Sequence, residues 1–225
     1  MKRNVFFLIL LLGCFIGFND FHPKDARADT PETPETQEIL NRMEKKYADN
    51  DFSADFHQVS TLTALEITET ASGKVFFSHP GKMRWEYLVP TQHQIISNGT
   101  TLWIYRPDEN QVVRGDAQAF FNSGAGGAFL SNISLVREQY NSHIETNKAD
   151  TDHITLVLEP KKESPDIKSI HIRILKANDY IVQVTTHNPY GDTTTLDFWN
   201  IVFKKIELSM FEFTTPDGVD LIEMN

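Results

Sequence analysis

Residues Ser78–Gln111 read SHPGKMRWEYLVPTQHQIISNGTTLWIYRPDENQ. Three short apolar runs in this stretch are separated by Pro-Gly, Val-Pro-Thr and Asn-Gly. Large aromatic side chains recur at every second position of two runs: Trp85 and Tyr87, then Trp103 and Tyr105. This period of two is typical of strands. The Asn-Gly pair between two such runs predicts a type I′ hairpin, whose two central residues both need a positive φ. The stretch therefore predicts antiparallel sheet.

The rest of the chain extends this pattern. Apolar residues at helical spacing predict an amphipathic helix over 35–48, with Thr33 as its cap. Alternating residues predict further strands, at 52–59, 62–69, 72–78, 152–159, 168–175, 179–187, 192–203 and around Phe211–Phe213. Short helices are expected at 116–121 and 128–136. The predicted fold is mainly β, a strongly curved antiparallel sheet of about ten or eleven strands forming an open barrel. Periodicity alone does not separate it from a sandwich.

Residues 1–28 have the pattern of a secretory signal. Lys2 and Arg3 precede an apolar run over 5–18, and Ala26-Arg27-Ala28 fits a cleavage site. Cleavage after Ala28 leaves 29–225 as a single soluble domain. A rival interpretation is that Leu11-Leu12-Gly13-Cys14 is a lipoprotein signal, with Cys14 acylated and retained. The apolar run continues past Cys14 to residue 18, which favours cleavage after Ala28.

Charge and cysteine content narrow the functional classes. The chain from Asp29 onward carries 17 basic and 29 acidic side chains, a net charge of −12. Such acidity argues against nucleic acid and anionic lipid surfaces as partners. Cleavage also removes the only cysteine, so no disulfide or thiolate metal site is expected.

No catalytic motif is present. The eight histidines are dispersed, and none forms a metal-binding pair on a helix. Gly124, Gly126 and Gly127 match neither a phosphate loop nor a dinucleotide fingerprint, and are interpreted as a hinge. The sequence therefore predicts no catalytic residue, no metal and no enzyme. The chain has 16 Phe, 6 Tyr and 3 Trp residues, which either pack an ordinary core or line a cavity. Composition alone favours the ordinary core.

Several segments resemble the outer-membrane lipoprotein carrier protein (LolA) family, over nearly the whole mature chain. They include the first strand, Phe52-x-Ala54-x-Phe56-x-Gln58, and the His79-Pro80 pair, which stands where the family has a basic residue before proline. The remainder are Met83 and Trp85, the hairpin residues 95–99 and 102–105, the apolar residues 128–130, and Phe211-x-Phe213-x-x-Pro216-x-Gly218-Val219.

The resemblance implies an incomplete barrel closed by short helices, with a cavity for the acyl chains of lipoproteins. It implies a monomeric periplasmic shuttle without a cofactor. Its partners would be acylated lipoproteins, an inner-membrane lipoprotein-releasing ABC transporter and an outer-membrane lipoprotein receptor. One sixteen-carbon chain in water costs roughly 12 kcal/mol, at about 0.8 kcal/mol per methylene, so a lipoprotein needs a carrier to cross an aqueous space.

The resemblance also implies a site. The expected cavity residues are Leu40, Met43, Phe56, Met83, Trp85, Phe129, Leu130 and Ile133. His79 is expected to clasp the lid where the family has arginine, and it offers at most two hydrogen bonds against the five donor groups of arginine. Strand parity places Arg84 on the face opposite Trp85. Two alternatives stay open: a periplasmic or Cys14-anchored lipid- or glycolipid-binding protein or lipoprotein receptor of the same fold and, more remotely, a periplasmic hydrolase.

Overall fold

A computed structural model describes residues 32–122, 129–145, 147 and 149–224. The strands form one 12-stranded sheet in the order β12-β6-β5-β4-β3-β2-β1-β11-β10-β9-β8-β7. All neighbours are antiparallel except β12 and β6, which are parallel. β12 and β7 do not pair with each other, so the sheet is curved but not closed. The prediction of a mainly β, open-barrel fold is confirmed.

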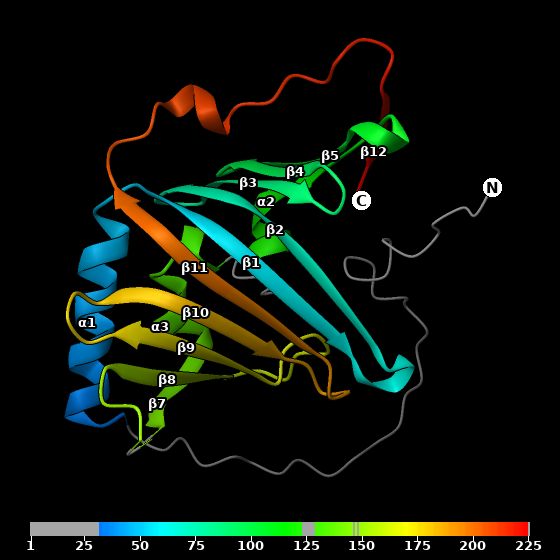
Figure 1. Cartoon of the computed structure of the whole chain (residues 1–225). Helices are drawn as coiled ribbons and strands as arrows, with labels where there is room; N and C mark the ends of the chain where they lie inside the picture. Colours follow the sequence, from blue (N-terminus) through cyan, green and yellow to red (C-terminus); the bar gives the residue numbers. More distant parts are fainter. Residues whose placement is uncertain (1–31, 123–128, 146, 148, 225) are drawn as a thin grey trace. The chain divides into compact units, whose positions relative to one another are not determined.

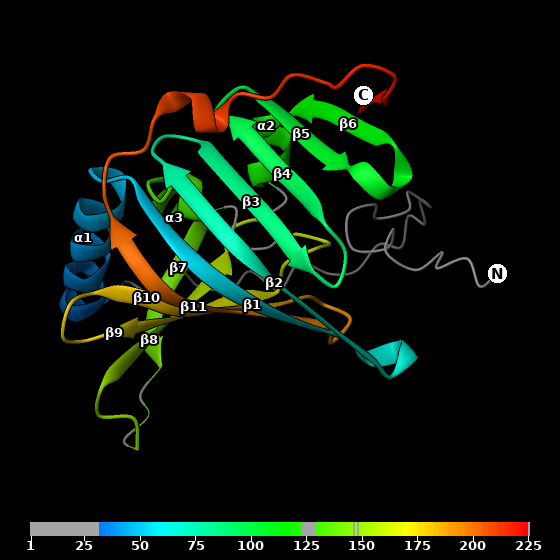
Figure 2. The same cartoon turned by 45° about the horizontal axis from the view of Figure 1, so that its top comes forward.

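The elements are as follows: α1 (Pro34–Ala48), β1 (Phe52–Leu62), η2 (Thr63–Leu65), β2 (Ile67–Ser78), β3 (Lys82–Val89), β4 (His93–Asn98), β5 (Thr101–Arg106), η3 (Pro107–Glu109), β6 (Gln111–Asp116), α2 (Ala117–Asn122), α3 (Leu135–Gln139), β7 (Tyr140–Glu145), β8 (His153–Pro160), β9 (Ser169–Leu175), β10 (Tyr180–His187), β11 (Thr193–Phe203), η5 (Leu208–Phe211) and β12 (Asp220–Glu223). Figures 1 and 2 show α2 and α3 on one face of the sheet, with α1 beside the turn between β9 and β10.

Helix α1 forms where its sequence predicts. The Thr33 side chain accepts a hydrogen bond from the backbone N–H of Thr36, and Pro34 occupies the first turn. The buried side chains of α1 recur at helical spacing: Thr36, Ile39, Leu40, Met43 and Tyr47. The backbone N–H of Ile181 on β10 donates to the Tyr47 hydroxyl over 2.6 Å, which ties the end of α1 to the sheet.

The inner face of the sheet carries the core. On β9, Ile170, Ile172 and Ile174 are fully buried, while the residues between them are partly exposed. This alternation is expected of an antiparallel sheet with one solvated face. The inward side chains of β1, β2 and β3 join the same apolar cluster together with α1.

The outer face of β3 and β4 is covered by the C-terminal segment, residues 204–219. Element η5 packs against these two strands, and Phe211 within it is completely buried. Farther on, the Phe213 ring lies 5.4 Å from Tyr105 and 6.3 Å from Trp103, between ring centroids. The chain then adds β12 to the edge of β6.

Several local predictions are wrong. Residues 62–69 and 72–78 do not form two strands, because β2 runs from Ile67 to Ser78. Phe211–Phe213 is a 3-10 turn and loop that covers a sheet face. A single helix over 128–136 was expected, but residues 129–131 form a 3-10 turn and α3 begins at Leu135. Three strands, β6, β7 and β12, were not predicted.

The hairpin between β4 and β5 is confirmed, but its turn type was predicted wrongly. Gly99 has φ +97°, while Asn98 is not among the residues with positive φ. The last paired residues of the hairpin are Ser97 and Leu102, so residues 98–101 lie beyond the ladder. The Asn98 side-chain oxygen accepts hydrogen bonds from the backbone N–H groups of Thr100 and Thr101, so the turn is organised by the side chain.

Candidate functional site

The eight side chains predicted to line a cavity lie together in the structure. They come from α1, β1, β3 and the segment before α3, and none is more than 3% exposed. All belong to one apolar cluster: Leu40, Met43, Phe56, Met83, Trp85, Phe129, Leu130 and Ile133.

Aromatic rings form the sheet wall of this cluster. The Phe56 ring lies edge-on to both Trp85 and Tyr87, with centroid distances of 5.0 Å in each case. Phe198 of β11 lies 6.3 Å from Trp85. A Cβ atom placed on Gly73 would lie 1.9 Å from the carbonyl oxygen of Glu86 and 3.0 Å from the Phe56 ring. Glycine at this position therefore lets β2 and β3 approach closely beneath the rings.

Sequence reasoning missed Tyr87 and Phe198 as members of this wall. The signal for Tyr87 is its spacing of two from Trp85, which places both on one face. The Tyr87 hydroxyl donates to the side-chain oxygen of Gln58 over 3.0 Å. Burial raises the pKa of Tyr87, so the phenol stays neutral and adds no charge to the apolar interior.

The segment from Phe129 to Ser134, which we call the lid segment, covers one side of the cluster. Phe129, Leu130 and Ile133 point into the core and are at most 3% exposed. The carbonyl oxygen of Ser131 accepts a hydrogen bond from the N–H of Gly81 over 2.7 Å. Gly81 has φ +73°, a value that glycine adopts without strain.

His79 contacts the lid segment. Its Nε2 atom lies 3.2 Å from the side-chain oxygen of Asn132 and 3.2 Å from the hydroxyl of Ser134. Arg84 lies on the opposite face, as strand parity predicts. It donates to Glu86 over 2.7 Å, to Gln94 over 3.0 Å and to the carbonyl oxygen of Met210 over 3.3 Å. Arg84 therefore holds the C-terminal segment. His79, in the turn between β2 and β3, contacts the lid segment.

The turn that carries His79 is positioned by Ser97, which sequence reasoning did not single out. The buried Ser97 hydroxyl donates to the carbonyl oxygen of Gly81 over 2.8 Å and accepts from the N–H of Gly99 over 3.0 Å. Ser97 thus joins the β2–β3 turn to the β4–β5 turn. The proposed hinge residues Gly124, Gly126 and Gly127 lie outside the described residues.

Sequence reasoning also missed Arg137, which lies within α3. Its Nε atom donates to Glu44 Oε1 over 2.5 Å, and one terminal nitrogen donates to Asn41 Oδ1 over 2.7 Å. The same nitrogen lies 3.4 Å from the carbonyl oxygen of Gln37, and the other lies 3.9 Å from Glu32. No sequence motif marks this contact, because α1 and α3 are almost a hundred residues apart.

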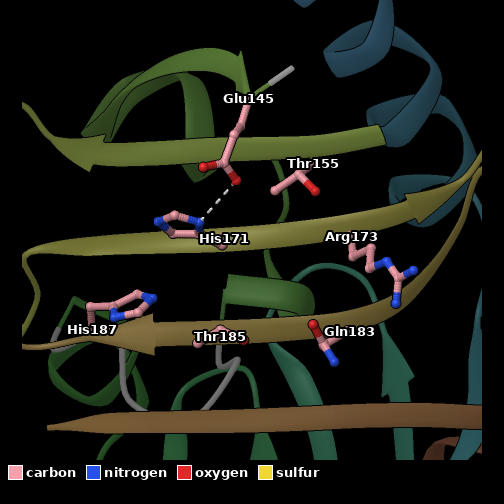
Figure 3. A pocket seen from close by; sticks show the side chains of 7 residues that line it. All are labelled: Glu145, Thr155, His171, Arg173, Gln183, Thr185 and His187. Atoms are coloured by element: carbon pink, nitrogen blue, oxygen red, sulfur yellow. Dashed lines mark ion pairs between the residues drawn. The ribbon is translucent and has the colours of Figure 1, made fainter. Parts of the chain in front are cut away.

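A polar depression of about 190 Å³ lies on the outer face of β7–β10 (Figure 3). Its lining residues are Glu145, Thr155, His171, Arg173, Gln183, Thr185 and His187. Most of these side chains bind their neighbours. His171 Nδ1 lies 3.7 Å from Glu145, Arg173 pairs with Asp150 at 2.7 Å, and Gln183 donates to Asp197 over 2.7 Å. Partial burial lowers the pKa of His187. This face is a hydrogen-bonded polar surface of the sheet.

The described ranges of the chain contain no group of three or more His, Cys, Asp or Glu side chains that could hold a metal ion. Within the same ranges, no helix is both long and apolar enough to cross a membrane.

Comparisons with known proteins agree with this architecture. A family model described as "Outer membrane lipoprotein carrier protein LolA" matches residues 49–214. An outer-membrane lipoprotein carrier protein of Chromobacterium violaceum is 31% identical over 176 residues, covering 76% of this chain and 80% of that protein. One from Haemophilus influenzae is 30% identical over 169 residues, covering 75% and 78%.

A solved structure supports the fold. A conserved protein from Thermus thermophilus aligns with a TM-score of 0.57 at 16% identity, covering 84% of this chain and 99% of that chain. The chain therefore belongs to the outer-membrane lipoprotein carrier protein (LolA) family. The curated relatives are named as carriers, which is a role without bond chemistry, and at the family level this chain is a lipoprotein carrier.

Proposed function

We propose that the mature chain is a periplasmic shuttle that encloses lipoprotein acyl chains between α1, the sheet and the lid segment. It would accept them from an inner-membrane lipoprotein-releasing ABC transporter and pass them to an outer-membrane receptor, as a monomer without a cofactor. The observation that carries this proposal is the convergence of five apolar side chains of α1, β1 and β3 with three from the lid segment, which polar contacts from His79 and Gly81 hold to the sheet.

In this proposal, an acyl chain enters the apolar cluster by displacing some of the cluster's own side chains. Burying a sixteen-carbon chain is worth roughly 12 kcal/mol, at about 0.8 kcal/mol per methylene. Displacing Phe129 and Leu130 from the core offsets part of this gain, because both are buried in this structure. Such an exchange keeps net affinity moderate, so the cargo can be passed on. Met43 and Met83 suit a variable interior, because unbranched side chains repack easily.

Site-specific photo-crosslinking tests the proposal. A photoreactive residue at Trp85 or Leu130 should crosslink to a triacylated lipoprotein. The matched controls are Trp199 and Leu208, which carry the same side chains but are 45% and 61% exposed. Crosslinks from the interior positions and not from the controls are expected. Crosslinks from the controls alone would contradict an acyl site in the interior.

The proposed start of the mature chain needs its own test. When the protein is expressed with its native signal, cleavage after Ala28 should give an intact mass equal to that of a chain starting at Asp29. A diacylated species that retains Cys14 would instead support an anchored lipoprotein receptor, the alternative that Leu11-Leu12-Gly13-Cys14 raises.

A further inference from the structure

The inner face of the sheet is apolar toward one end and polar toward the other. On β1, the inward side chains of Phe52, Ala54 and Phe56 belong to the apolar cluster, and the next inward positions are Gln58 and Ser60. Four further strands of the same sheet make this change (Figure 2): the inward neighbours are Trp85 and Tyr87 on β3, Ile95 and His93 on β4, Ile104 and Arg106 on β5, and Leu196 and Thr194 on β11. We call the polar members the polar belt: Gln58, Ser60, Tyr87, His93, Arg106 and Thr194.

Hydrogen bonds and a ring contact join the polar belt across the strands. The Ser60 hydroxyl lies 3.3 Å from that of Thr194 and accepts a hydrogen bond from Gln58 Nε2 over 3.0 Å. The Gln58 side-chain oxygen accepts from the Tyr87 hydroxyl over 3.0 Å. The Tyr87 ring stacks on the His93 ring, with centroids 4.0 Å apart and an angle of 13° between the planes. The belt is therefore one ordered row that borders the apolar cluster.

Arg106 supplies the positive charge of the polar belt. Its side chain is only 14% exposed, and its Nη1 atom donates to Glu109 over 3.4 Å and to Gln111 over 3.5 Å. Both distances exceed the usual range of about 2.7–3.2 Å for N–H···O hydrogen bonds, so these contacts are weak. Burial, and to a smaller extent the charge of Arg106, lower the pKa of His93, as expected for a guanidinium near the belt. Arginine carries five N–H donors, and among the described residues only Nη1 of Arg106 makes hydrogen bonds, so donors are left for a further acceptor.

Aromatic rings adjoin these donors. The Phe56 ring lies 5.0 Å from Tyr87, and the Trp85 ring stacks on Tyr87 at 6.3 Å, between centroids. The apolar wall continues to Met83, four residues back along β3, which is about 13 Å at 3.3 Å per residue. An apolar wall that ends at a row of hydrogen-bond donors matches a molecule with an acyl chain and a carbonyl group at its head.

We propose that the polar belt binds the ester carbonyl at the head of an acyl ligand, while the chain lies on the aromatic rings toward Met83. Arg106 donates to the carbonyl oxygen, and the Tyr87 hydroxyl lies beside it. Glu109 offsets the charge of Arg106, so a neutral ester suits the belt better than a carboxylate does. This inference rests on the proposed function for the acyl nature of the cargo. It adds the direction in which the cargo lies and the group that is recognised at its head.

Two lipids that differ by one carbonyl group test the inference. Monohexadecanoyl glycerol is an ester, whereas monohexadecyl glycerol ether has the same chain length and the same glycerol head without the carbonyl. Equilibrium binding of both, radiolabelled and supplied as monomers, should show that the native chain prefers the ester about tenfold, the effect of one hydrogen bond to a charged group. Arg106→Met should bring this ratio to about one and leave the affinity for the ether nearly unchanged.

Arg114→Met is the matched control. Arg114 lies on the neighbouring strand β6, next to the inward Val113 and therefore on the outer face, where it pairs with Glu223 at 2.6 Å. This variant should keep the native ester-to-ether ratio. Tyr87→Phe keeps the ring and removes the hydroxyl, so it should lower the ratio less than Arg106→Met does. If Arg106→Met unfolds and loses both lipids, the ratio in Tyr87→Phe decides.

Three results would overturn the head site. One is equal affinity of the native chain for ester and ether, which would leave acyl binding, and with it the proposed function, intact. Another is a native ratio in the deciding variant. The third is tighter binding of hexadecanoate than of the ester, which would identify a carboxylate as the preferred head. Failure of the native chain to bind either glycerol lipid would contradict the proposed function together with the head site.

Discussion

The outer face of β3–β5 and the outer face of β8–β10 belong to one sheet but are stabilised differently. The first is covered: Ile96 and Phe211 are completely buried there, and Phe213 packs on Tyr105. The second faces solvent and carries the polar network around His171, Arg173 and Gln183 (Figure 3). The sequence reflects the difference. Strand β9 alternates strictly, whereas β4 has two consecutive buried isoleucines, at positions 95 and 96. Consecutive apolar residues in a strand indicate that both of its faces are covered.

The largest expected effect on stability comes from truncating the buried Phe211 side chain on the covered face. Phe211→Ala should lower the free energy of unfolding by about 3–5 kcal/mol, because a fully buried ring leaves a cavity behind. Urea unfolding measures it. Leu208→Ala is the control in the same 3-10 turn, since Leu208 is 61% exposed and should matter little. A loss of similar size in both variants would mean that the turn as a whole, and not the burial of Phe211, stabilises this face.

A smaller effect on stability is expected at Phe213, where the C-terminal segment that covers the sheet is itself partly exposed. A double-mutant cycle between Tyr105→Leu and Phe213→Leu should give a coupling energy of about 0.5–1.5 kcal/mol from the ring contact at 5.4 Å. The same cycle between Tyr105→Leu and Thr185→Val, on the uncovered face, should be additive. Absence of coupling in the first cycle would show that residues 212–219 lie on the sheet without stabilising it.

The uncovered face should respond to pH. Hydrogen bonds from His153, and then from Arg173, hold the pKa of Asp150 well below its ordinary value of 3.8. A lowered pKa stabilises the folded state above the ordinary value, and this stability is lost as the pH falls through the folded pKa. The stability difference between the native chain and Asp150→Asn should therefore shrink from about pH 6 to about pH 2.5 in urea unfolding. A constant difference for Asp150→Asn across this pH range would contradict the assignment.

The smallest effect is expected from a single outward hydroxyl. Thr185→Val removes the 3.1 Å contact with Thr195 but adds a residue that favours strands. The free energy of unfolding should change by no more than about 0.5 kcal/mol, as is usual for surface positions. A clear loss of stability, measured by the same urea titration, would indicate that hydrogen bonds between threonine hydroxyls stabilise this face.

Prediction from sequence succeeded where side chains show a clear period. The amphipathic residues of α1, the alternation in β1 and β9, and the face of Arg84 all appear in the structure as expected. It failed where an element has few or no buried residues. Strand β12 has no buried residue, and β6 has a single one, Val112, so neither carries a period to detect. The Phe211-x-Phe213 pattern imitates a strand because both rings pack on the sheet from a loop.

Within the candidate site, apolar residues could be predicted from the sequence and polar contacts could not. Apolar members such as Met83 and Trp85 could be named because strand parity groups them. Polar attachments depend on which distant elements meet, and Arg137 reaches α1 from a position 93 residues away from Glu44. His79 was singled out only through the family resemblance, and its contacts with Asn132 and Ser134 could not be derived from spacing.

The parallel strand β12 has a practical consequence for anyone who handles this protein. It ends the sheet with four solvent-exposed residues, of which Asp220 and Glu223 are charged and Leu221 and Ile222 are apolar. A short edge strand flanked by charges discourages the addition of strands from other molecules. An affinity tag or fusion partner appended after Asn225 would continue directly from this edge. Apolar, β-forming linkers would lengthen the open edge and promote aggregation, so Pro-containing or charged linkers are the safer choice.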